Sequence, residues 1–207
     1  MTDDDGRSGF TFNYAPQFGR NRALAGYDVP HNFQLAAVYE LPFGKGKRFA
    51  SSGPARWILG DWQINNVFAA YQGRPFSVSA SGAALNAPGN TQTADQIKPT
   101  VEKLGGVGPG QFFFDLKAFA AVNAVRFGSS GRNMLRGPGV VNLDLGVFRR
   151  FPLTERFTLE FRTEAFNSTN TPHFASPSSN VNSSDFMQVL SATEDQRQIR
   201  FGLRLTW

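Results

Sequence analysis

The sequence predicts an all-β fold: an antiparallel, curved meander of about five or six long strands. Three observations predict it. Segments of about ten residues alternate strictly between apolar and polar side chains, as strands with two unlike faces do. Gly and Pro, 21 and 12 of 207 residues, interrupt the chain too often for a helical bundle. The connections between the alternating segments are themselves alternately short and long.

The expected strands are the five segments with this alternation, at 32–41, 61–71, 140–149, 155–166 and 197–207. Over 33–41, 62–70, 141–147, 157–165 and 199–207, one row of 24 side chains is uncharged, and Asn66 and Thr163 are its only polar members. The opposite row has 25 positions, and nine of them are charged. A short sixth strand is suggested over 8–14, where Phe10, Phe12 and Tyr14 alternate with polar residues and Gly.

The connections favour one kind of all-β protein. About 68 residues separate the second strand from the third, and about 30 separate the fourth from the fifth, whereas 151–154 is a tight turn. Short periplasmic turns that alternate with long extracellular loops are typical of a transmembrane β-barrel, and strands of ~9–11 residues span a membrane when tilted. We therefore expect an N-terminal segment at 1–31, then barrel strands at 32–207 with a long extracellular loop at about 80–138. Five or six strands make only an incomplete barrel.

The C-terminal strand supports a membrane location. Its residues Arg200, Gly202, Leu205 and Trp207 resemble the C-terminal signal by which bacterial outer-membrane barrels are recognised for insertion. Gly202 would relieve crowding on the lumen side of this strand. An ordinary edge strand that ends in Trp is the alternative interpretation.

The direction of the strands makes a further prediction. If Trp207 ends in the periplasm, the periplasmic ends of the apolar rows are Tyr39, Trp62, Phe157 and Trp207. All four are aromatic, as in the interfacial girdle of an outer-membrane barrel. A soluble sandwich has no reason to order its aromatic residues by strand direction.

Charged residues on the last two strands suggest a wet lumen. Glu160, Arg162 and Glu164 share one face of the fourth strand, and Arg200 and Arg204 share one face of the fifth. Carboxylate pairs can serve acid–base catalysis, but Arg on the neighbouring strand favours a cross-strand charge ladder.

Several segments, taken in order, resemble the late strands of large TonB-dependent outer-membrane receptors of the Oar-like type. They are YDVPHNF at 27–33, YELPFGKGKRF at 39–49, WQIN at 62–65, GRPF at 73–76, GRNMLRGPG at 131–139, NLDL at 142–145, FRTEAFN at 161–167 and NTPHF at 170–174. The resemblance covers about residues 27–207 and implies a bacterial outer-membrane location.

The resemblance implies that this sequence is only one part of a receptor. Members of this family have a signal peptide, a TonB box, a plug domain and a barrel of about 22 strands, and this sequence contains only the last strands. We therefore expect a fragment that forms the wall of a substrate-uptake pore. Its expected partners are outer-membrane lipid and the barrel-assembly machinery, with the plug, the other strands and TonB engaged only through missing regions.

Other functions find little support. The net charge of +5 raises nucleic acid as a partner, but the Arg residues are scattered and we expect none. His31 and His173 are the only histidines and Cys is absent, so we expect no metal site, cofactor or catalytic residue, and no enzyme. Two alternatives stay open: a soluble all-β binding or adhesion module, and a small eight-stranded barrel with extra strands at 8–14 and 112–119.

Overall fold

The computed structural model describes residues 11–193 and 196–207. The chain forms two compact units. We call Asn32–Ala70, Val141–Pro172 and Glu194–Trp207 the sheet unit, and Met1–His31, Tyr71–Val140 and His173–Thr193 the loop unit. The description of each unit concerns its described residues.

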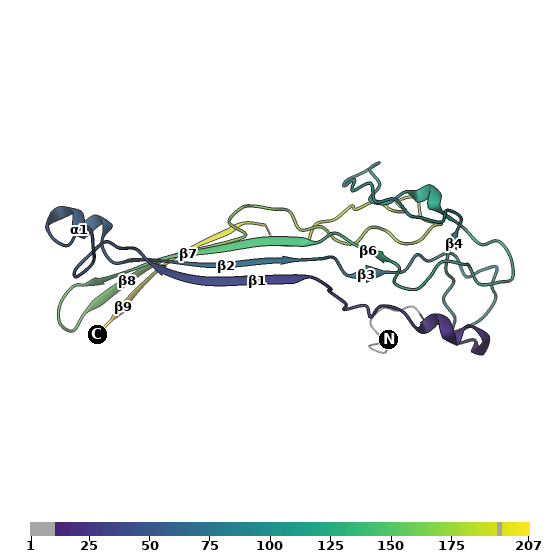
Figure 1. Ribbon diagram of the computed structural model, residues 1–207, viewed down its shortest axis with the longest axis horizontal. Helices are drawn as coiled ribbons and strands as arrows, with labels where there is room; N and C mark the ends of the chain where they lie inside the picture. The colour runs from purple at the N-terminus through teal and green to yellow at the C-terminus, as the bar shows by residue number, and fades with distance from the viewer. Residues whose placement is uncertain (1–10, 194–195) are drawn as a thin grey trace. The chain divides into compact units, whose positions relative to one another are not determined.

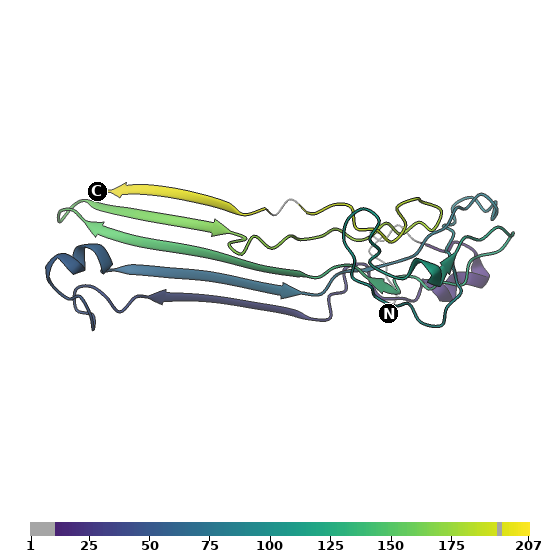
Figure 2. The same cartoon turned by 90° about the horizontal axis from the view of Figure 1, so that it is seen from above.

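The sheet unit is one open, five-stranded sheet of order β1-β2-β7-β8-β9. Its strands are β1 (Asn32–Glu40), β2 (Trp62–Tyr71), β7 (Val140–Pro152), β8 (Thr158–Phe166) and β9 (Gln198–Thr206). Successive strands run in opposite directions (Figure 2). All five strands expected from the alternation are therefore confirmed, and they form the predicted open antiparallel meander.

Two local features set the ends of the strands. The strand β7 extends to Pro152, which has no N–H to donate to a neighbouring strand. A hydrogen bond from the Leu153 backbone N–H to the Phe157 carbonyl (2.9 Å) closes the turn that follows. A short helix that the alternation does not predict, α1 (Gly53–Leu59), lies in the β1–β2 connection. Pro54 fits the first turn of the helix. The helix ends at Gly60, whose backbone N–H donates a hydrogen bond to the Arg56 carbonyl (2.9 Å).

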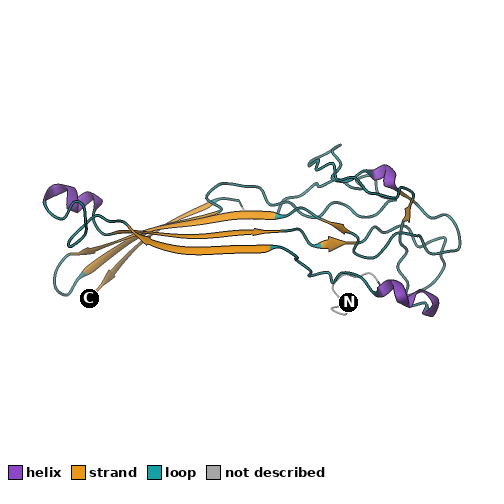
Figure 3. Cartoon of the chain, in the orientation of Figure 1, coloured by secondary structure: helices purple, strands orange, loops and turns teal. Residues whose placement is uncertain are grey.

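The loop unit is mostly irregular, as the colours of Figure 3 show. Its elements are short (Figure 1): η1 (Ala15–Asn21), β3 (Pro75–Phe76), β4 (Asp95–Gln96), η2 (Leu116–Ala118), β5 (Phe119–Ala120) and β6 (Leu135–Arg136). The pairs β3–β6 and β4–β5 are both antiparallel.

A hydrophobic core holds the loop unit together. It comprises Val78, Ala80, Ala94, Phe113, Phe114, Ala118, Phe119, Leu135, Phe186, Met187 and Val189. Backbone hydrogen bonds join the two long connections directly, from Phe113 to Met187 (2.8 Å) and from Ser79 to Ser179 (2.9 Å). The long loops thus fold together as a packed body, although their sequence shows no strand or helix periodicity.

The extra strands that a small eight-stranded barrel would need are not found among the described residues. The segment 8–14 lies partly outside the described residues, and 11–14 form no strand. The segment 112–119 contains η2 and only the first residue of β5, because Asp115 caps a 3-10 turn there by accepting a bond from the Lys117 amide (2.9 Å). The described long strands form one sheet and not two sheets packed face to face, as a soluble sandwich requires.

Candidate functional site

The apolar row of the sheet unit is exposed. In the β8–β9 register Phe161 lies opposite Leu203, and Thr163 lies opposite Phe201. Phe201 and Leu203 expose 74% and 72% of their surfaces. The same row on β1 exposes Phe33 and Leu35. A continuous apolar face of this kind needs a partner other than water, because soluble monomers rarely expose large apolar patches.

Aromatic residues mark one end of this row. Tyr39 lies near the end of β1, Trp62 begins β2, Phe157 directly precedes β8 and Trp207 directly follows β9. Because the strands are antiparallel, these positions share one end of the sheet, where the C-terminus also lies (Figure 2). Aromatic rings at the end of a lipid-facing row suit a membrane interface, where one side of the ring is apolar and the other is wet.

The opposite row is polar, and its register places the five predicted lumen residues together. Glu160 lies opposite Arg204, Glu164 opposite Arg200, and Arg162 opposite Gly202.

The ion pair at Glu160, however, is made to the other neighbouring strand. The Arg150 Nε of β7 donates to the Glu160 carboxylate at 3.0 Å. The Arg200 guanidinium lies over the Phe166 ring, 5.0 Å from its centroid. Sequence reasoning did not include Arg150 because its expected strand ended at residue 149.

A hollow of about 410 Å³ opens near the turns, and it is lined mainly by the polar row together with Trp62 and Arg149 of the apolar row. Glu40, Gln63, Asn65, Phe148 and Glu160 are among its lining residues. Lys47 also lines it and pairs with Glu40 at 2.7 Å. Matched charges and amides make this surface suited to water or to a polar protein segment rather than to lipid.

Arg200, Gly202 and Leu205 of the predicted insertion signal lie in β9, an edge strand of the sheet, and Trp207 directly follows it. A Cβ on Gly202 would lie 3.0 Å from Arg162 Nε and 3.1 Å from its Cγ. The Arg162 side chain therefore lies across Gly202, which is the crowding that the missing side chain relieves. Leu205 is on the apolar row, where it pairs with Leu159 of β8.

Sequence reasoning missed a second arginine, Arg149, which follows Val147 on the apolar row. It lies opposite Phe161 and is only 6% exposed. Its guanidinium donates to the Ile58 carbonyl at 2.8 Å and also to the Trp57 carbonyl, both in α1. The only signal in the sequence is a charge that interrupts an otherwise apolar row.

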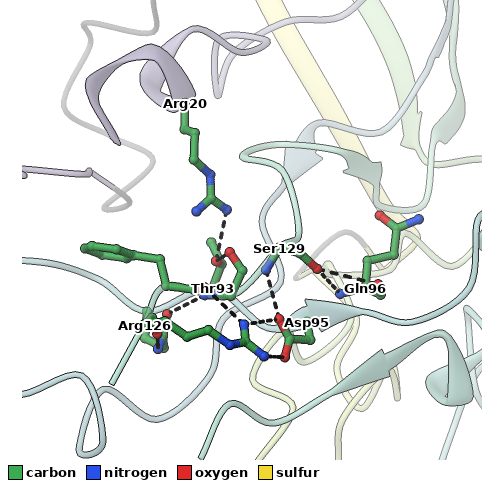
Figure 4. Close-up of polar contacts among 9 residues, drawn as sticks. Arg20, Thr93, Asp95, Gln96, Arg126 and Ser129 are labelled. Atoms are coloured by element: carbon green, nitrogen blue, oxygen red, sulfur yellow. Dashed lines mark hydrogen bonds and ion pairs between the residues drawn. The ribbon is translucent and has the colours of Figure 1, made fainter. Parts of the chain in front are cut away.

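The loop unit contains a polar network of its own (Figure 4). Arg126 donates twice to the Asp95 carboxylate, at 2.8 and 2.7 Å, and the Ser129 amide donates to it at 3.0 Å. The Arg126 bond lowers the pKa of Asp95 below its usual range. Arg20 donates to the Thr93 hydroxyl (3.2 Å) and to the Ser130 carbonyl (2.7 Å). These contacts join η1 and β4 to the segment 126–130, so their role is to hold loops in place.

Three further observations concern the described residues. Among residues 11–193 and 196–207, no three His, Asp or Glu side chains gather as metal ligands. No helix in the described part of the chain is long and apolar enough to cross a membrane. A hollow of about 480 Å³ in the loop unit is lined by Tyr71, Lys103, Met134 and Arg136, among others. Arg136 is held there by an ion pair with Asp28.

An open meander with one lipid-suited row and one wet row is the wall of an outer-membrane β-barrel. Comparison with protein families agrees: residues 1–200 match the model described as outer membrane beta barrel domain. The chain belongs to this family, and its location is the bacterial outer membrane. Comparison with curated proteins and with solved structures gave no significant match. The alternative of a soluble module is therefore set aside.

Proposed function

We propose that this chain forms the C-terminal barrel strands of a TonB-dependent receptor of the Oar-like type, and so part of the wall of a substrate-uptake pore. The observation that carries the proposal is the two-faced meander, which runs in order through the receptor-like segments to the aromatic end of β9. Five strands cannot close a barrel, because even the smallest need about eight. The remaining strands and the plug would come from other parts of the receptor.

The proposed role is structural and not enzymatic. The outward row contacts outer-membrane lipid, and the barrel-assembly machinery recognises the β9 strand. The polar row, with its hollow of about 410 Å³ near the turns, faces the lumen and the plug. TonB acts on the receptor through regions that this sequence does not contain, and nucleic acid has no part.

Cysteine labelling of intact bacteria tests the topology, because the natural sequence has no Cys. Val125→Cys places a thiol at an 83% exposed position in the loop unit, and Glu155→Cys places one in the β7–β8 turn. A membrane-impermeant maleimide should label the first in whole cells and the second only after the outer membrane is opened. Labelling of Glu155→Cys in whole cells would contradict the proposed orientation.

The receptor assignment needs a separate test. The genomic reading frame upstream of Met1 should continue into a plug domain and a signal peptide. In the full-length protein, Gln63→Cys on the polar row should cross-link to the plug, whereas Ile64→Cys on the apolar row should not. An upstream frame with no plug would leave the barrel wall in place and exclude the TonB-dependent role.

A further inference from the structure

The helix α1 lies at the turn end of the sheet unit, near the ends of β7, β8 and β9 (Figure 1). Trp62, on the apolar row, donates its Nε1–H to the Ile58 carbonyl at 2.9 Å and packs edge-on against Phe161 at 6.1 Å. Arg149 is on the same row and bonds to the same end of the helix. The last turn of α1 therefore covers the girdle end of the lipid-facing row.

The exposed side of this helix is strongly apolar. Trp57 and Ile58 expose 70% and 69% of their surfaces, and Leu59 is exposed beside them. A short helix with Trp and aliphatic side chains on its free side, at the end of a lipid-facing row, fits the headgroup region of a membrane.

A small hollow lies beside the helix and contains charges of both signs. Its volume is about 40 Å³, and its lining residues are Arg56, Trp57, Asp61, Arg149, Arg150, Phe151 and Pro152. The Arg149 guanidinium lies 4.3 Å from the centroid of the Phe151 ring and 5.3 Å from that of Trp62. Its Nη atoms bond to α1, but its Nε is buried and has no hydrogen-bond partner among the described residues. A buried guanidinium N–H without an acceptor is unfavourable, and an anionic oxygen would satisfy it.

We propose that this hollow binds the headgroup of a phospholipid from the periplasmic leaflet, with its phosphate at Arg149 and Arg56. Asp61 lines the same hollow, so a headgroup that also bears an ammonium, as phosphatidylethanolamine does, matches both charges. The acyl chains would lie along Trp57 and Ile58. Lipid is favoured over free phosphate because the charged hollow adjoins an exposed apolar surface. The inference rests on the proposed orientation, in which the turns face the periplasm.

Native mass spectrometry of the detergent-purified protein tests the proposal, with phosphatidylethanolamine and phosphatidylglycerol added in turn. We expect phosphatidylethanolamine to be retained, and Arg56→Gln to weaken its retention about tenfold. Arg56 contributes only its backbone carbonyl to the Arg149 contacts, so this variant leaves them in place. Arg149→Lys keeps the charge but removes the Nε donor and should weaken retention as well. Arg204→Gln, on the polar row, is the matched control and should retain lipid as the wild type does.

Asp61→Asn tests the specificity. Asp61 has a positive φ of 60°, which Asn tolerates, so the backbone should be preserved. Loss of the carboxylate should shift the preference from phosphatidylethanolamine toward phosphatidylglycerol. Equal retention by wild type, Arg56→Gln and Asp61→Asn would overturn the proposal, as would displacement of the lipid by inorganic phosphate alone. Because cysteine labelling reports orientation independently, a wrong orientation and a missing lipid site give different results.

Discussion

The sheet unit and the loop unit follow opposite rules of burial. Every buried hydrophobic residue of the described chain lies in the loop unit, where Phe119 and Met187 belong to one core. The sheet unit has the regular strands, yet Phe201 and Leu203 on its apolar row are largely exposed. The loop unit is organised as a protein folded in water, whereas the sheet unit needs lipid to cover its apolar row. Regular secondary structure and a hydrophobic core are thus separated within a single chain.

The largest expected effect comes from the loop core. Phe119→Ala should destabilise the loop unit by about 3–5 kcal/mol, because it removes a buried ring that packs edge-on against Phe186 at 6.2 Å. Limited proteolysis should then cut the segments 71–140 and 173–193 faster, while the resistance of the barrel to unfolding in detergent is retained. Val125→Ala, at an exposed position, is the control. Equal loss of the barrel in Phe119→Ala would show that the two units do not have separate sources of stability.

The matching change in the sheet unit is Leu203→Arg. On the lipid-facing row near the membrane midplane it should cost about 2–4 kcal/mol of stability. Arg204→Leu, one residue further on the polar row, should be tolerated. Urea unfolding of the complete barrel in lipid vesicles measures both. If the two substitutions were equally harmful, the assignment of the two rows to lipid and lumen would be wrong.

The same contrast explains what the sequence could predict. The alternation predicts the five long strands because the two faces of each strand contact different environments. Consecutive residues point to opposite faces, so they alternate between apolar and polar. The loop core shows no such period: it joins Val78, Phe113 and Met187, which are far apart in sequence and meet only in the folded chain. Such contacts have no local pattern.

The candidate site was predictable to the same extent. The alternation predicts that Glu160 and Arg204 share the polar row. It does not predict the register that brings them opposite each other, because a connection of about 30 residues joins β8 to β9. The ion pair from Arg150 and the contacts of Arg149 with α1 depend on three further residues of β7 and on a helix without a regular pattern. A charge on the apolar row was the one available signal for Arg149.

Acid should weaken the loop unit. Hydrogen bonds from Arg126 to Asp95 and from Lys98 to Asp115 lower the pKa of each carboxyl. A carboxyl whose pKa is lowered by folding stabilises the folded state fully at pH values above its unfolded pKa of about 3.9. That stabilisation is lost as the pH falls through the pKa of the folded state. Loop proteolysis should therefore accelerate below about pH 4. Asp95→Asn should reduce this pH dependence, and an unchanged acid profile would count against the ion pair.

The smallest expected effect is at Gly202, on the polar row of the sheet unit. Gly202→Ala places a methyl group against the Arg162 side chain, which is flexible and can move aside, so the loss should be below about 1 kcal/mol. Gly202→Val should be worse, because a branched side chain leaves Arg162 less space. Arg162→Ala in the Gly202→Val background should recover stability if crowding is the cause. If the double variant is as unstable as Gly202→Val, crowding is not the cause, and glycine is instead needed for the recognition of β9 during membrane insertion. The yield of inserted barrel would measure that effect directly.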